Sequence, residues 1–135
     1  MTIISEIKYL IVHCSDTPDK KNIDSTFIHK MHLSFGWDGI GYHKVICRNG
    51  IIQNGRPEFW VGAHVKSKNT ISLGVCLIGR NSFTPEQFVS LEKVLRAWKK
   101  QYGNIEILGH RDIVKTNKTC PNFDVRKWCK KVGLI

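Results

Sequence analysis

The feature that most constrains the fold is one tight strand–turn–strand pattern in a chain whose other strands are separated by helices. The apolar segments 42–47 and 51–53 flank Arg48-Asn49-Gly50, and Asn-Gly between two such segments is the strongest short signal for a β-hairpin. The remaining strand candidates alternate with helical ones, which is typical of a sheet that has helices packed on its faces. The chain therefore predicts a mixed sheet.

Three further strands are expected over residues 8–13, 70–78 and 104–108. Each segment is a short run rich in Ile, Leu or Val, and its length suits a strand better than a helix. Together with the hairpin they give the expected fold class, α/β (α+β in stricter schemes), with a central mixed β-sheet flanked by helices in a single domain.

Helix caps mark the other elements. Thr84 is the expected N-cap of the best-defined helix, with Pro85 at the first position and Gln87 completing a capping box. Its predicted apolar stripe consists of Phe88, Leu91, Leu95 and Trp98. A second helix is expected from Asp24 or Ser25 to about Phe35, with an apolar face of Phe27, Met31 and Phe35, and a third from Asp124 to Gly133.

Length and hydropathy bound the class of protein. A chain of 135 residues is expected to form one domain with one core. No apolar run reaches the roughly 18 residues that span a bilayer, so we expect no integral membrane segment. The first residues lack the apolar region and cleavage site of a signal peptide, which predicts a protein that is cytoplasmic on synthesis.

The cysteines predict thiols rather than disulfides. Their number, five, is odd, and the expected cytoplasmic setting is reducing. Cys14, Cys47 and Cys76 are expected to be reduced and buried, because free cysteine behaves as a small apolar residue. Cys14, next to His13 on a strand, is expected to point away from it into the core. Cys129 has no evident role.

The formal net charge of +10 favours anionic partners, which include nucleic acid, membrane surfaces and anionic cell-envelope polymers. The charge does not choose among these partners, since the basic residues are spread along the chain.

Three residues at strand ends or in loops could bind a metal. His13 ends one apolar strand, His110 follows another, and Cys120 lies in a loop before Pro121. Two imidazoles and a thiolate suit zinc, and three protein ligands leave a fourth position open, as in catalytic sites. Taken alone this signal is weak, because six histidines and five cysteines allow many such triples.

Two competing patterns are set aside. His29 and His32 share a helix face, but no third ligand lies nearby in the sequence, so a structural role is favoured. His110-Arg111-Asp112 matches a kinase catalytic-loop tripeptide without the other kinase motifs and is attributed to chance.

Six segments in order along the chain resemble the amidase-2 family, which includes small phage endolysins and peptidoglycan-recognition proteins. The segments are Ile11-Val12-His13-Cys14-Ser15, Gly39-Ile40-Gly41-Tyr42-His43, Val61-Gly62-Ala63-His64, Ser72-Leu73-Gly74-Val75-Cys76-Leu77-Ile78-Gly79, Leu108-Gly109-His110-Arg111-Asp112 and Lys118-Thr119-Cys120-Pro121-Asn122-Phe123-Asp124. The chain looks closest to the short phage lysozymes that are amidases.

The resemblance implies a single zinc amidase domain over residues 1–135. It implies one Zn²⁺ bound by His13, His110 and Cys120, with Tyr42 and Lys118 catalytic. From the residues alone, Tyr42 is a core aromatic and Lys118 a solvated loop charge. His64 is a candidate contact to substrate or to a metal ligand, and His43 is expected to face away from the site.

The implied function is zinc-dependent hydrolysis of the amide bond between N-acetylmuramic acid and L-alanine of peptidoglycan, by a monomeric endolysin that reaches the wall through a membrane lesion. Two alternatives stay open at this point. One is a module that binds peptidoglycan without cutting it, and the other is a regulator that binds nucleic acid or a polymerase.

Overall fold

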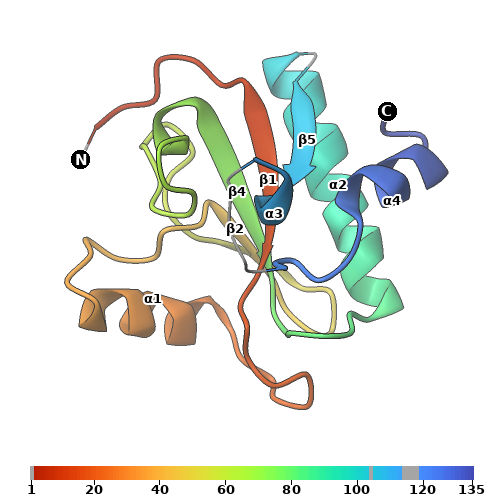
Figure 1. Cartoon of the computed structure of the whole chain (residues 1–135). Helices are drawn as coiled ribbons and strands as arrows, with labels where there is room; N and C mark the ends of the chain where they lie inside the picture. Colours follow the sequence, from red (N-terminus) through yellow and green to blue (C-terminus); the bar gives the residue numbers. More distant parts are fainter. Residues whose placement is uncertain (1, 104, 114–118) are drawn as a thin grey trace.

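The sheet is mixed, as the hairpin pattern predicts. The computed structural model describes residues 2–103, 105–113 and 119–135, and within them five strands lie in the order β3-β2-β4-β1-β5 (Figure 1). The strands are β1 (Tyr9–Cys14), β2 (Lys44–Ile46), β3 (Ile52–Asn54), β4 (Ser72–Leu77) and β5 (Glu106–Gly109). β2 and β3 form the antiparallel hairpin, and the other pairs are parallel.

Helices lie on both faces of this sheet. They are α1 (Ser25–Ser34), α2 (Pro85–Tyr102), the single turn α3 (His110–Ile113) and α4 (Val125–Lys131). Figure 1 shows α2 and α4 together on one side and α1 apart from them on the other. The predicted caps are confirmed: the side chains of Asp24 and Thr84 accept the predicted backbone N–H bonds, and Gln87 completes the capping box.

Alternation along β1 assigns its side chains to the two faces. Leu10 and Val12 belong to the main core, which α2 and α4 cover, whereas Ile11 packs with Val65 and Leu108 on the other face. Because side chains alternate along a strand, His13 shares the face of Ile11. The main core therefore packs against one face of the sheet, and His13 lies on the opposite face.

The buried face of α1 differs from the predicted one. Phe27 and Phe35 are 48% and 57% exposed, while Ile28 and His32 are the buried residues of this helix. Ile28 packs against Ile40, and Met31, which the prediction included, packs half-buried against the same cluster. His32 tolerates burial because its ring accepts a backbone hydrogen bond.

The strand expected over residues 70–78 begins later, at Ser72. Residues Asn69–Ile71 form a 3-10 turn instead. The Asn69 side chain accepts the N–H groups of His64 and Val65, both at 2.9 Å, and thereby ties this turn to the preceding loop. A local side-chain bond of this kind competes with strand pairing.

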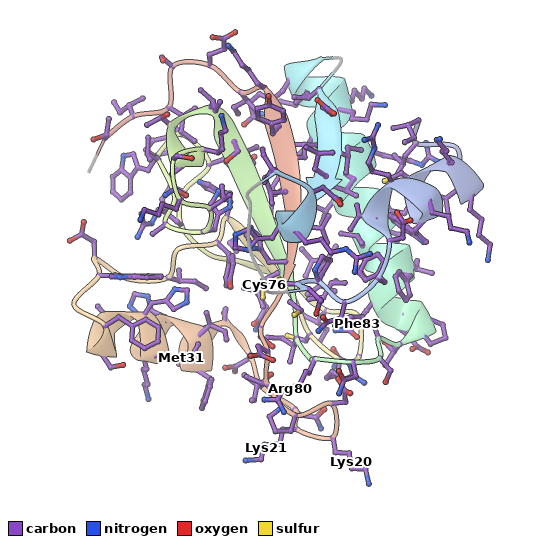
Figure 2. The ribbon with its side chains drawn as sticks, viewed as in Figure 1. Lys20, Lys21, Met31, Cys76, Arg80 and Phe83 are labelled. Atoms are coloured by element: carbon purple, nitrogen blue, oxygen red, sulfur yellow. The ribbon has the colours of Figure 1, made fainter. Side chains whose placement is uncertain are left out.

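All five cysteines are free thiols. Cys14 and Cys76 are buried, as predicted, and Figure 2 shows Cys76 near the middle of the molecule. Cys47 is only half-buried, contrary to prediction, because it lies just beyond the end of β2 beside the edge strand β3, where its thiol donates to the Gln53 side chain. Among the described residues, no helix combines the length and apolar character that a bilayer crossing requires.

Candidate metal centre and active site

The three candidate ligands meet at the carboxyl edge of the sheet. His13 lies near the end of β1, and His110 follows directly on β5. Since β1 and β5 are parallel, their carboxyl ends lie side by side. Cys120 returns to the same edge, and one ligand atom from each of the three residues lies within 4.8 Å of the other two.

Burial keeps His13 neutral. Its side chain is 1% exposed, and its ring lies 4.8 Å from the ring of His110, centroid to centroid. Desolvation lowers the pKa of His13 well below its usual value, and the neighbouring histidines His64 and His110 lower it further. A neutral imidazole keeps one nitrogen lone pair, which is what a metal ligand requires.

Cys14 is buried, as predicted, but its thiol also contacts a candidate ligand, which the sequence does not predict. Its Sγ lies 3.7 Å from Sγ of Cys120, and its backbone N–H donates to that sulfur at 3.2 Å. The reason is that β1 ends at Cys14, where the segment containing Cys120 and Asn122 passes the edge of the sheet. The hydrogen bond between the thiols lowers the pKa of Cys14 and raises that of Cys120.

Tyr42 faces the ligands from the loop before β2. Its ring centroid lies 5.1 Å from that of His13. Burial raises the pKa of Tyr42 well above its usual value, and nearby thiols, Cys76 first among them, add to this effect. The phenol therefore stays protonated and can donate a hydrogen bond. Its neighbour His43 does not line the groove, as expected, and instead contacts the carbonyl of Trp60 and the N–H of Gly74.

The loop that carries Tyr42 is held by two histidines and an arginine. Nδ1 of His29 accepts the N–H of Ile40, and Nδ1 of His32 accepts the N–H of Gly41. The structural role favoured for this histidine pair is thus confirmed. Arg56, which is 8% exposed, donates to the carbonyls of Gly39, Ile40 and Val61. The sequence pattern gave no sign of Arg56, because its partners are backbone groups from other loops.

His64 lies directly against His13. Nδ1 of His64 is 2.9 Å from Nε2 of His13, and His64 is 8% exposed. Of its two predicted roles, the contact to a candidate ligand is present in the structure. A contact to substrate stays a prediction.

A groove of about 810 Å³ opens above this cluster. The candidate ligands, Tyr42 and His64 lie along it, and Phe35 and Trp37 form part of one wall. Trp37 is 41% exposed, and its ring packs 4.6 Å from that of His32. Figure 2 shows Met31, which also lines the groove, on the α1 side. Lys118, the other predicted catalytic residue, lies outside the described residues.

Comparison with known proteins identifies the family. The model of the Amidase_2 family, described as N-acetylmuramoyl-L-alanine amidase, matches residues 4–123. The chain belongs to this amidase family. The expected enzyme class is therefore confirmed, and the cluster of His13, His110 and Cys120 is a candidate metal centre of a family amidase.

Relatives of this amidase include phage proteins of similar length. It is 36% identical to an endolysin of Klebsiella phage KP32 over 138 residues, covering 96% of this chain and 90% of the relative. It is 35% identical to an endolysin of Escherichia phage T7, covering 93% and 87%. The solved structure of the amidase LysC from Clostridium intestinale matches with a TM-score of 0.84 and 28% identity, over 98% of this chain and 93% of that one. The fold expected from the resemblance is confirmed.

Proposed function

We propose that this amidase uses one zinc ion to hydrolyse the amide bond between N-acetylmuramic acid and L-alanine of peptidoglycan, as a phage-type endolysin. One observation carries the proposal: His13, His110 and Cys120 converge beside the Tyr42 phenol at the floor of an open groove. The endolysins among the relatives support the lytic role.

The residues present fit zinc. Two histidines and a cysteine are preferred zinc ligands, and three of them leave a position for water or substrate. Their ligand atoms lie within 4.8 Å of one another, so small side-chain adjustments would bring all three onto one ion. A zinc ion held there supplies Lewis acidity, which polarises an amide carbonyl and makes water more acidic.

Tyr42 acts on the oxygen of the scissile amide. As water adds to the carbonyl carbon, that oxygen gains negative charge, and a hydrogen bond from the neutral phenol stabilises it. The raised pKa keeps the Tyr42 proton in place for this purpose. His32 and Arg56 contribute indirectly by fixing the loop that precedes Tyr42.

Lys118 is proposed as the second catalytic group on the basis of the family resemblance. Its ammonium would complement the same negative charge. The alanine nitrogen must gain a proton as the carbon–nitrogen bond breaks, and Tyr42 and Lys118 are the two candidate donors.

The groove and the charge support a large, anionic substrate. Exposed aromatic side chains such as Trp37 and Phe35 offer flat apolar faces beside the proposed cleavage site. A net charge of +10 favours attraction to anionic envelope polymers. We propose that the protein acts as a monomer on the wall after release through a membrane lesion, with His64 at the floor of the substrate groove.

Mass analysis of fragments released from purified sacculi tests the proposal. An amidase releases stem peptides with a free alanine amine and leaves glycan strands intact with free lactyl groups. Cys120→Ser, which removes one proposed ligand, should release almost nothing. Binding of sacculi without any released peptide would favour the non-cutting module instead, and cleaved glycan would contradict the proposed bond.

A further inference from the structure

A second buried histidine touches the proposed ligand His13. His13 and His64 are 1% and 8% exposed, and Nε2 of His13 lies 2.9 Å from Nδ1 of His64. Two nitrogens at this distance form a hydrogen bond only if one carries a hydrogen and the other a lone pair. The direction of this bond decides which nitrogen of His13 is left for a metal.

The neighbours of His64 fix that direction. The Ser72 hydroxyl lies 2.7 Å from the carbonyl oxygen of Lys68 and donates its single hydrogen there. Ser72 Oγ must then accept at its 3.3 Å contact with Nε2 of His64. A neutral imidazole carries one hydrogen, so Nδ1 of His64 is an acceptor and Nε2 of His13 is the donor.

We infer that Ser72 and His64 form a positioning relay that holds His13 in its Nε2–H tautomer and directs the Nδ1 lone pair of His13 to the metal. This inference rests on the proposed function, in which His13 binds zinc. The relay begins at a backbone carbonyl of the loop before β4 and ends at the ligand.

The fold leaves a space shaped for the His64 ring. A Cβ atom added to Gly74 of β4 would lie 2.5 Å from Nδ1 of His64, and one added to Gly62 would lie 2.6 Å from its Cδ2. Both distances are far below van der Waals contact. The backbone of His64 is fixed as well, because its N–H donates to the Asn69 side chain at 2.9 Å. Ring and backbone are thus both constrained where the relay needs them.

Such a relay changes metal affinity rather than the chemical step. A hydrogen-bond partner on the far nitrogen fixes the tautomer and ring angle of a ligating histidine, and its loss typically weakens metal binding by roughly 10- to 100-fold. His64 is therefore a positioning residue, which acts through His13.

The first test measures the zinc dissociation constant by competition with a chromophoric chelator. His64→Phe keeps a ring without an acceptor and should weaken zinc binding by roughly 10- to 100-fold. His64→Asn places an amide oxygen near the position of Nδ1 and should bind zinc within a few-fold of wild type. His32→Phe is the matched control, since His32 is also buried but accepts from Gly41, and it should keep its zinc affinity.

The second test reads the tautomers directly. Long-range nitrogen–proton NMR of the zinc-loaded wild-type protein should place the His13 and His64 hydrogens on Nε2 in both rings. Ser72→Ala breaks the far end of the relay and should weaken zinc binding less than His64→Phe does. If His64→Phe does not fold, Ser72→Ala takes its place as the test of the relay.

Three results would overturn the relay: ligation of zinc by Nε2 of His13, unchanged zinc affinity in both His64→Phe and Ser72→Ala, or equal losses in His64→Asn and His64→Phe. Failure of the wild-type protein to bind zinc would instead overturn the proposed function. The two ideas are therefore tested separately.

Discussion

Tyr42 places a neutral phenol beside the ligand cluster from a loop rather than from the sheet. Its ring packs 5.1 Å from His13 on one side and 5.5 Å from His32 on the other. Those contacts involve the ring and not the hydroxyl, so packing and chemistry can be separated by a single substitution.

Tyr42→Phe should lower the rate of peptidoglycan cleavage by about 10²–10³-fold, the usual cost of one lost donor to a developing negative charge. Because the ring remains, the melting temperature and zinc content should match those of the wild type. The measurement is the rate of sacculus clearing, taken together with the melting temperature and the zinc content of the same variant. Clearing at the wild-type rate would remove Tyr42 from the mechanism, and loss of zinc with activity would make it a support of the metal site.

At the residue scale, the sequence predicts groups that sit at the ends of apolar runs better than it predicts their contacts. His13 and His110 could be found because each follows a strand pattern. The contact between Cys14 and Cys120 could not, since alternation along β1 says nothing about what crosses the sheet edge. The bond between His13 and His64 joins residues 51 positions apart, and no local pattern encodes it.

At the scale of elements, residues 39–41 belong to the loop that links α1 to β2, and they directly precede Tyr42. Arg56 donates to the carbonyls of Gly39, Ile40 and Val61 at 3.4, 3.0 and 2.9 Å. A buried guanidinium surrounded by carbonyls is stabilising only while all of these bonds are made.

Arg56→Ala should lower the free energy of unfolding by about 3 kcal/mol, because it leaves buried carbonyls without donors. Cleavage should fall as well, since the loop before Tyr42 loses its anchor, while zinc stays bound. Arg96→Ala is the control: the Arg96 side chain is 48% exposed, pairs with Glu92 on α2 and donates to the Val132 carbonyl at the surface, so its loss should cost only about 1 kcal/mol. Urea unfolding of both variants measures the free energy of unfolding. Equal losses of stability in Arg56→Ala and Arg96→Ala would contradict the anchoring role of Arg56.

Elements with local signals were predicted closely, and those set by tertiary contacts were not. The capping box at Thr84 and the Asn-Gly turn are short-range features, and both are present. The prediction for the buried face of α1 is wrong at Phe27 and Phe35 and holds in part at Met31. It misses His32, because burial of His32 depends on an N–H that arrives from Gly41. Apolar content alone favoured Phe27, which is exposed.

For the molecule as a whole, buried neutral histidines make stability depend on pH. Burial is the largest cause that lowers the pKa of His13, His43 and His64, and it lowers that of His32 from 6.5 to about 4. In the unfolded chain these rings take up protons near their usual pKa, so acid favours unfolding. Their contribution is complete above about pH 6.5 and is lost as the pH falls toward 4.

The free energy of unfolding in the presence of a chelator should therefore fall steadily below pH 6.5. His32 alone should account for about 2 kcal/mol at pH 5. His32→Asn, whose amide oxygen can still accept the Gly41 N–H, should show a shallower fall. Urea midpoints that stay constant from pH 7 to pH 4.5 would contradict buried neutral histidines.

The most direct test of the metal centre is the zinc content of the purified protein and of two cysteine variants. Cys120 and Cys14 have thiols 3.7 Å apart, yet only Cys120 belongs to the ligand cluster. Elemental analysis should find about one zinc per chain in the wild type, nearly the same in Cys14→Ser, and little in Cys120→Ser. Full zinc occupancy in Cys120→Ser, or no zinc in the wild type, would contradict the proposed metal centre.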